Sequence, residues 1–262
     1  KGGVGKSTIA LNLALEISEN YKVGLLDLDI YGPSLSTLIN FSDQPKFDGN
    51  KIFPIEKFGI KMMSFGFINN ENSPTIWRGP MVSRMTQQFF DDVEWGELDY
   101  LILDLPPGTG DIQLTLVQKI ALDGAVIVTT PQQLSNIDVK KGSDMFNKVK
   151  IPIIGVIENM SGFYIEGNIL DFKNNQKLKI NNNLVNPDNK GEFSFKVDIF
   201  KGCSGKNESD RLNLPLLGQI GLDPRLSECC DEGTPYVVKY KDTLVKKEFE
   251  KISNYIISKN IK

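Results

Sequence analysis

The sequence predicts an α/β fold in which helices cover both faces of a doubly wound, mostly parallel sheet. Short apolar runs alternate with amphipathic stretches along most of the 262 residues, which is typical of such sheets. A glycine-rich loop opens the chain directly before a helical stretch, and two of the apolar runs end in aspartates. We expect one domain spanning residues 1–262. We expect the first strand of its sheet, which should precede the glycine-rich loop, to lie upstream of residue 1.

The opening residues match most of the phosphate-binding pattern G-x-x-x-x-G-K-[ST]. Glycine adopts backbone angles that other residues avoid, so successive N–H groups of such a loop can converge on one anion. The unpaired N–H groups of the following helix add partial positive charge. A plain glycine-rich turn is the alternative, which the Lys-Ser pair at this spacing disfavours. The candidate nucleotide-binding residues of this loop are Lys1, Gly2, Gly3, Val4, Gly5, Lys6, Ser7 and Thr8.

The remaining elements follow from apolar spacing and from breakers. Residues 6–18 have helical spacing, and the run 23–29 is expected to be a buried strand that delivers two carboxylates to the sheet edge where open α/β sheets bind ligands. Loops are expected where Gly and Pro cluster, at 30–34 and 105–111. Further strands are predicted at 59–65, 98–104, 125–130, 153–158 and 214–220, and further helices at 80–91 and 134–149.

Two segments depart from this alternation. Residues 163–200 are polar and rich in Asn, and the alternation of Phe193, Phe195, Val197 and Ile199 with polar residues predicts a small β-excursion inserted late in the chain. Residues 241–262 place apolar side chains on one helical face. We expect this tail to be a helix that packs on the sheet. A helix lying on a membrane surface is the alternative.

Composition excludes several classes of function. A net charge of −3 argues against nucleic-acid binding through a broad basic face. No apolar run approaches the ~20 residues that span a bilayer. Three Cys in a chain of this length do not make a disulfide framework, which favours a cytoplasmic setting. The chain has no His, so nucleophilic catalysis with a His base and His-ligated metal sites are both excluded.

Three aspartates are candidates for chemistry at the sheet edge. Asp104 ends an apolar strand before a Gly-containing loop, the position from which a carboxylate holds Mg²⁺ through its water shell. The Ser7 hydroxyl is then expected to ligate the ion, and Lys6 to reach the β- and γ-phosphates. Asp27 is expected on the Mg²⁺ side of the loop. Asp29 is our candidate for orienting the attacking water, with a turn or helix cap as its alternative. Phosphoryl transfer needs no covalent nucleophile.

The loop Lys1-Gly2-Gly3-Val4-Gly5-Lys6-Ser7 resembles that of the deviant Walker A ATPases, the MinD, ParA and Mrp group. In that group the extra Lys reaches the nucleotide of the partner subunit in a face-to-face dimer. The resemblance therefore implies an ATP-dependent homodimer in which Lys1, Lys6 and Asp29 act in ATP hydrolysis.

Longer blocks narrow the resemblance to the Mrp/ApbC branch of ATP-dependent iron–sulfur cluster carriers. The blocks are residues 27–34, 104–111, 157–162, 215–224 and 231–235, so the resemblance covers residues 1 to about 238 apart from 163–200. It implies that Asn159 touches the adenine and that Asp223 and Pro224 lie near the same ring. ParA relatives usually carry Asp-Pro-Gln in the segment that reads Asp27-Leu28-Asp29-Ile30 here.

The cargo site is where this chain departs from the branch. A C-x-x-C motif for a [4Fe–4S] cluster should follow residues 159–161, and no Cys is present there. Cys203, in a Gly-rich loop, is the candidate iron–sulfur ligand, paired with its counterpart in a dimer. The alternative is that the chain has kept the ATPase and lost the cargo site. Cys229 and Cys230 are adjacent and are expected to be structural.

The sequence therefore predicts a slow ATPase that acts in iron–sulfur cluster assembly or transfer, with ATP and Mg²⁺ as ligands and with scaffold or apo-protein clients as partners. One alternative is a positioning ATPase of the MinD or ParA kind that acts on a membrane or a partner protein. A second alternative is an adaptor that binds ATP without hydrolysing it. Neither nucleic acid nor a membrane is expected as a partner.

Overall fold

The structure, a computed structural model, describes residues 2–68, 79–108, 110–173, 177–180 and 183–259. Its helices are α1 (Lys6–Ser18), α2 (Leu35–Leu38), α3 (Phe65–Ile68), α4 (Gly79–Asp91), α5 (Asp111–Lys119), α6 (Ser135–Lys148), α7 (Ser204–Leu212), α8 (Pro224–Glu232), α9 (Tyr236–Lys239) and α10 (Leu244–Ser258). Its strands are β1 (Val23–Asp27), β2 (Lys46–Asp48), β3 (Lys51–Phe53), β4 (Ile55–Lys57), β5 (Ile60–Ser64), β6 (Tyr100–Asp104), β7 (Ala125–Thr129), β8 (Ile153–Asn168), β9 (Leu178–Ile180), β10 (Asn183–Val185), β11 (Glu192–Val197) and β12 (Leu216–Leu222).

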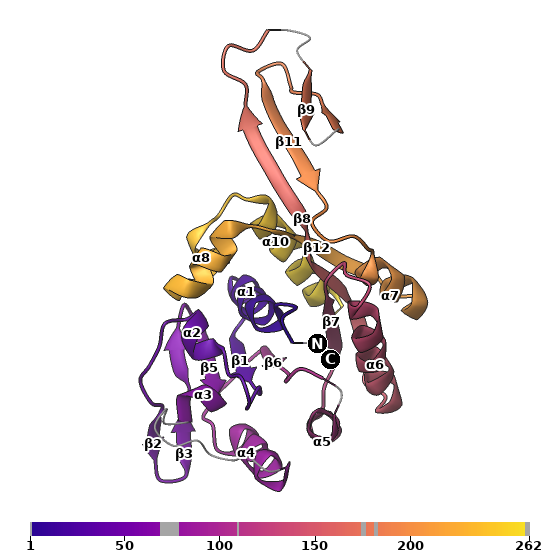
Figure 1. The fold of residues 1–262 in the computed structure, drawn as a ribbon. Coiled ribbons are helices and arrows are strands. Elements are labelled where there is room, and N and C mark those ends of the chain that lie inside the picture. Colours follow the sequence, from indigo (N-terminus) through magenta and orange to yellow (C-terminus); the bar gives the residue numbers. More distant parts are fainter. Residues whose placement is uncertain (1, 69–78, 109, 174–176, 181–182, 260–262) are drawn as a thin grey trace.

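The first sheet has the strand order β4-β5-β1-β6. β1 pairs in parallel with both β5 and β6, and its register places Asp27 opposite Asp104. All five residues of β1 are buried, as expected for a parallel strand covered on both faces. Figure 1 shows α1 on one side of β6 and α4 and α5 on the other. The predicted α/β layering and parallel pairing are confirmed in this part of the chain.

The second sheet is built around β8. β7 and β12 pair with it in parallel, and β11 pairs antiparallel with its outer half. We expected a single doubly wound sheet, whereas the main strands of the described residues form two separate sheets, beside the small two-stranded sheets β2-β3 and β9-β10. Within them β6 pairs with β1 and β7 pairs with β8, and a cavity of about 420 Å³ lined by α1, β6, β7 and α6 lies between the two sheets. The cavity separates the strand edges that a continuous sheet would join.

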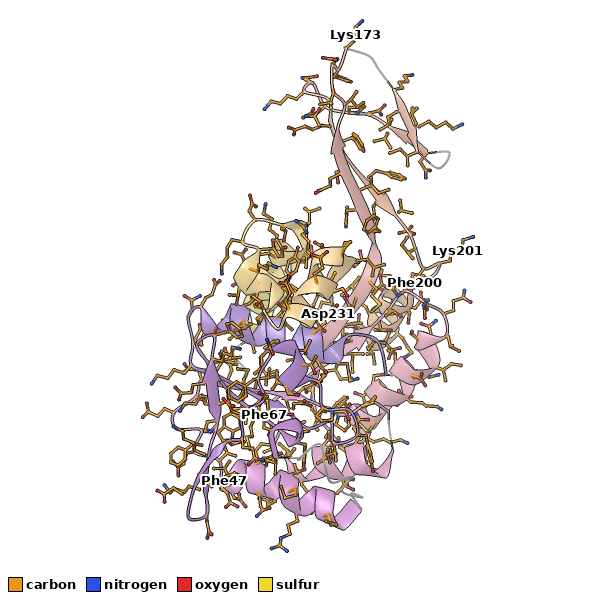
Figure 2. The ribbon with its side chains drawn as sticks, turned by 60° about the vertical axis from the view of Figure 1, so that its left-hand side comes forward. Phe47, Phe67, Lys173, Phe200, Lys201 and Asp231 are labelled. Atoms are coloured by element: carbon orange, nitrogen blue, oxygen red, sulfur yellow. The ribbon has the colours of Figure 1, made fainter. Side chains whose placement is uncertain are left out.

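Residues 163–200 build an arm that projects from the body (Figure 1). The outer half of β8 pairs with β11 from Phe163↔Val197 to Asn168↔Glu192, and β9 pairs with β10. Figure 2 shows Lys173 at the far end of this arm and Phe200 and Lys201 where it rejoins the body. The excursion expected from alternating Phe193, Phe195 and Val197 is thus the strand β11.

The terminal helix α10 packs its apolar face on α1 and β12. Val245, Phe249 and Ile252 are buried there. A buried ion pair joins the two helices, because the ammonium of Lys246 lies 2.5 Å from Oε2 of Glu16 and the two side chains are 7% and 1% exposed. None of the described helices combines the length and apolar character needed to cross a lipid bilayer. The apolar face of α10 is therefore used inside the protein.

Candidate nucleotide-binding site

The glycine-rich loop leads directly into α1, as its sequence predicts. Gly3 and Gly5 have φ of 77° and 84°, which only glycine adopts without strain. The first intrahelical bond runs from the N–H of Ile9 to the carbonyl of Gly5 at 2.9 Å, and no side chain caps the start of the helix. The N–H groups of the first turn are therefore oriented for an anion. Lys1 lies outside the described residues.

A residue from the other sheet holds this loop in place. Val4 is buried, and its carbonyl accepts a 2.9 Å hydrogen bond from Nδ2 of Asn159. Asn159, in β8, is itself only 6% exposed. Asn159 thus lies beside the phosphate-binding loop, as its assignment to the nucleotide site requires, although the contact shown is to the loop backbone.

Asp104 and Ser7 meet at the carboxyl end of β6. The carboxyl of Asp104 accepts a hydrogen bond from the Ser7 side chain and lies within the electrostatic influence of Lys6. Burial raises the pKa of Asp104 above its ordinary value, while the Ser7 bond and the Lys6 charge oppose the rise and the Asp29 charge adds to it. The structure therefore brings together the three side chains that the motif assigned to phosphate and Mg²⁺.

Asp27 lies beside Asp104 and organises the loop that follows β1. Its Oδ1 accepts from the N–H of Asp29 at 2.9 Å, and its Oδ2 accepts from the hydroxyl of Ser64 at 3.0 Å and from the N–H of Leu35 at 3.4 Å. Burial, followed by the charge of Asp104, raises the pKa of Asp27 to about 6. The carboxyls of Asp27 and Asp104 are both buried at the carboxyl ends of neighbouring strands. Two such charges repel each other, and a divalent cation would relieve that repulsion.

Asp29 lies after the end of β1, in the loop. Its Oδ1 accepts from the N–H of Tyr31 at 3.2 Å and from the N–H of Gly32 at 3.1 Å, so the carboxyl caps a turn. The same carboxyl is close enough to Asp104 to raise its pKa. One oxygen of Asp29 therefore has a structural role, and the carboxyl as a whole lies near Asp104.

The residues present fit a Mg²⁺ ion held together with a nucleotide. Hydroxyl and carboxylate oxygens, the ligands that Mg²⁺ prefers, are supplied by Ser7, Asp104 and Asp27. Over the described part of the chain, no group of three or more His, Cys, Asp or Glu side chains is arranged to hold a metal by itself. Such a site would thus depend on the oxygens of a bound phosphate, which is the usual way in which proteins bind Mg²⁺.

The second predicted nucleotide segment, Asp223 and Pro224, lies at the start of α8, whose opposite end contacts α1. Asp223 caps α8 by accepting from the N–H of Arg225 at 2.9 Å, and it also accepts from the Arg225 guanidinium and from the hydroxyl of Tyr236. These bonds keep the pKa of Asp223 below its ordinary value in spite of burial. Pro224 is the first residue of the helix. At the other end of α8, Sγ of Cys230 lies 3.8 Å from the Thr8 hydroxyl.

The three cysteines are free and differ in exposure. Cys229 is buried, Cys230 is half-buried and Cys203 is exposed. Burial raises the pKa of both neighbouring thiols, which disfavours the thiolate that binds metals. Cys203 precedes α7, and its Sγ donates to Oδ1 of Asn207 at 3.4 Å. Among the three, Cys203 is the thiol that a cargo could reach.

Two buried polar residues of this region were not singled out from the sequence. Glu158, 2% exposed, accepts from the N–H of Gly205 at 2.9 Å, from the Ser161 hydroxyl and from the Gln219 side chain, so it ties β8 to α7 and β12. Ser64 holds Asp27. The available signals were an acidic residue after the apolar run 153–157 and a hydroxyl at the end of the predicted strand 59–65.

Comparison with known proteins places this geometry in context. The model of a ParA-type family described as NUBPL iron-transfer P-loop NTPases matches residues 1–182 and 179–257. The chain is 41% identical to an iron–sulfur cluster carrier protein of Aquifex aeolicus over 266 residues, which cover 98% of this chain and 65% of that protein. The chain therefore spans about two thirds of the length of this relative.

Solved structures show the same fold. A nucleotide-binding protein of Archaeoglobus fulgidus in complex with ADP superposes with a TM-score of 0.67 at 31% identity, over 89% of this chain and 83% of that one. The septum site-determining protein MinD of Pyrococcus horikoshii, complexed with Mg-ADP, superposes with a TM-score of 0.65 over 98% of this chain and 92% of its own, at 17% identity. The second likeness concerns the fold alone.

Proposed function

The chain belongs to the NUBPL group of ParA-type iron-transfer P-loop NTPases, and from this membership we propose that it binds and slowly hydrolyses ATP and carries or transfers an iron–sulfur cluster. The observation that carries the ATP part is the hydrogen bond between Ser7 of the loop and Asp104 at the end of β6. That bond joins the hydroxyl and the carboxylate that P-loop ATPases use around Mg²⁺. The ADP complex of the Archaeoglobus relative supports the same assignment.

In this proposal the phosphates lie on the N–H groups of Gly2 to Thr8, with Lys6 neutralising the β- and γ-phosphates. Ser7, Asp104 and Asp27 hold Mg²⁺, which supplies charge neutralisation when it is bound. Asp29 orients the attacking water with the carboxylate oxygen that does not cap the turn. Catalysis is then positioning and charge stabilisation, which is what phosphoryl transfer requires.

The nucleoside and the partner subunit complete the proposed site. Asn159, Asp223 and Pro224 are proposed to lie near the adenine, and for Asn159 the contact with Val4 of the loop supports this. Lys1 is proposed to reach the nucleotide of a second copy of the chain in an ATP-dependent homodimer. These assignments rest on the family resemblance of each residue.

The cargo part of the proposal rests on family membership and on one thiol. Relatives such as the Aquifex protein are named iron–sulfur cluster carriers, whereas this chain has no C-x-x-C after Asn159. We propose that Cys203 from each of two copies contributes to holding a [4Fe–4S] cluster, completed by ligands from outside the protein. Four thiolates are the usual requirement, so we propose that the cluster is labile and passes readily to an apo-protein client. Three free thiols support a cytoplasmic setting.

The cavity between the two sheets supports the proposal that one further strand completes the domain. The apolar side of α1 and the facing edges of β6 and β7 line it, and a parallel strand leading into the glycine-rich loop would pair with both edges. The sheet would then be continuous and doubly wound.

The alternative of a MinD-like positioning ATPase is supported by the shared fold. Membrane binding through the terminal helix, which this alternative would use, is disfavoured because the apolar face of α10 is already buried against α1 and β12.

One pair of measurements tests the proposal. Steady-state phosphate release with Mg-ATP should be slow but measurable, and its absence in a protein that binds ATP would favour the non-catalytic adaptor.

Anaerobic reconstitution with iron and sulfide should give a dimer with substoichiometric iron that apo-ferredoxin removes. A protein that takes up no iron at all would contradict the carrier assignment without touching the ATPase.

A further inference from the structure

The buried side chain of Asn159 donates a hydrogen bond to the carbonyl of the peptide between Val4 and Gly5. We propose that Asn159 is a positioning residue that orients the Val4–Gly5 peptide for phosphate binding, independently of any contact with the nucleoside base. This inference rests on the proposed function, since it concerns the same ATP site.

The contact itself is well determined chemically. The carbonyl of Val4 can only accept, so the Asn159 atom that faces it at 2.9 Å must be the amide nitrogen. The two residues are 155 positions apart in the sequence, and both are buried, Val4 at 3% and Asn159 at 6% exposure. Water therefore competes poorly for either group, and a buried carbonyl left without a partner would be unfavourable.

Peptide geometry converts this contact into an orientation of the phosphate-binding groups. A trans peptide is planar, so its C=O and N–H point in opposite directions, and no described peptide bond is cis. Fixing the Val4 carbonyl toward Asn159 therefore fixes the N–H of Gly5 away from it. Asn159 lies on the buried side of the loop, so the N–H of Gly5 faces the open side, where Gly2 and Gly3 are exposed.

Gly5 is suited to this arrangement in two ways. Its φ of 84° is left-handed, and a Cβ at this position would collide with Nδ2 of Asn159. A side chain would therefore displace the amide as well as strain the backbone. The loop and the amide approach each other as closely as a glycine allows.

The amide is held on a rigid strand. Asn159 lies in β8, between β7 and β12, and its backbone is in register with Ile220. The preceding residue, Glu158, is tied to the N–H of Gly205 and to Gln219. An anchored side chain of this kind orders the loop before the ligand arrives, which lowers the ordering cost of binding.

The positioning role and a base contact predict different specificities. If Asn159 orients the peptide, its loss weakens every ligand that carries the phosphates, whether or not a base is attached. If it acts only through the adenine, its loss changes the preference for ATP over GTP and leaves base-free ligands unaffected.

The test measures displacement of a fluorescent ATP analogue, in Mg²⁺ buffer, by inorganic tripolyphosphate, by ATP and by GTP. In Asn159→Leu, which keeps the branched shape of the side chain and removes the donor, we expect all three affinities to fall by the same factor of about three to ten, the effect of one lost hydrogen bond. Asn159→Ala is a second variant of smaller size and should give the same loss. Asn12→Leu is the matched control, because Asn12 is also a buried amide, 2% exposed, and bonds the backbone of Thr8 and Val237. It should lower thermal stability while changing tripolyphosphate affinity by less than about twofold.

Unchanged tripolyphosphate affinity in both Asn159 variants, together with a reduced preference for ATP over GTP, would overturn the inference and leave the proposed ATPase intact. An equal loss of tripolyphosphate affinity in Asn12→Leu would overturn the inference as well, because the loss in the Asn159 variants would then reflect general stability. An unmodified protein that binds none of the three ligands would instead overturn the proposed function.

Discussion

Lys246 is expected to contribute strongly to stability, because it neutralises a carboxylate inside the protein. The change Lys246→Met removes the charge and keeps most of the side-chain length. Glu16 would then be left 1% exposed, with its Oε1 already without a hydrogen-bond partner among the described residues. Burial raises the pKa of Glu16 even with Lys246 present, so the variant should hold this carboxyl in its neutral form.

The size of the effect follows from the cost of protonating Glu16. At pH 7 the carboxyl must take up a proton about 2.5 pH units above its ordinary pKa of 4.5, and at about 1.36 kcal/mol per unit this costs about 3 kcal/mol of folding free energy. Removal of one partner of a buried ion pair typically costs a similar amount, about 3–5 kcal/mol. For a raised carboxyl pKa the cost grows with pH above the unfolded pKa, so at pH 5 it should shrink to about 1 kcal/mol.

Urea denaturation followed by circular dichroism measures this loss at pH 5 and at pH 7. Lys247→Met is the matched control, because Lys247 is the next residue of α10 and its ion pair with Asp242 is exposed, so the midpoint should not change. Glu16→Gln combined with Lys246→Met should recover most of the stability, since no buried charge remains. A loss below about 1 kcal/mol at pH 7, or an equal loss at both pH values, would refute the reasoning.

Three further predictions concern the site and the cargo. Lys6→Ala should abolish ATP binding or hydrolysis, because no other residue of the motif supplies charge to the β- and γ-phosphates; calorimetry with Mg-ATP and phosphate release check it, and unchanged values would exclude the P-loop assignment. Asp29→Asn should retain Mg-ATP binding and slow hydrolysis by about tenfold or more, since an amide cannot accept the proton of water; lost binding with a normal rate per bound ATP would make Asp29 structural. Iron retained after reconstitution should be lost in Cys203→Ala and kept when Cys229 and Cys230 are both changed to Ala, and a stable four-iron dimer in Cys203→Ala would show that other ligands hold the cluster.

Much of the fold could be predicted because buried parallel strands are marked by local composition. The runs at 98–104 and 125–130 became β6 and β7 within a few residues, since a short apolar stretch between breakers favours a strand. The end of β1 differs from the prediction, which extended this strand to Asp29. The strand stops at Asp27, and Asp29 lies in a turn capped by its own carboxyl, because aspartate side chains compete with the ladder for backbone N–H groups.

The residues of the candidate site could be predicted from motifs, whereas two long-range contacts that hold the site in place could not. The spacing of Gly5, Lys6 and Ser7 is a local pattern, so it could be found in the sequence. The bond from Asn159 to Val4 and the bond from Ser64 to Asp27 join residues 155 and 37 positions apart. Nothing in the local sequence of either partner specifies such a contact, since it arises from strand order and register.

The continuity of β8 has a mechanical consequence. One 16-residue strand carries Glu158 and Asn159 in the body and continues to Asn168 in the arm (Figure 1). Between these two parts Met160 and Gly162 have left-handed φ of 57° and 101°, and the pairing with β12 shifts register between Ile220 and Leu222, so the strand is irregular where it leaves the body. These irregular residues lie directly after Asn159, which contacts the phosphate-binding loop. A spectroscopic label near Lys173, at the far end of the arm (Figure 2), would show whether nucleotide binding at that loop changes the orientation of the arm.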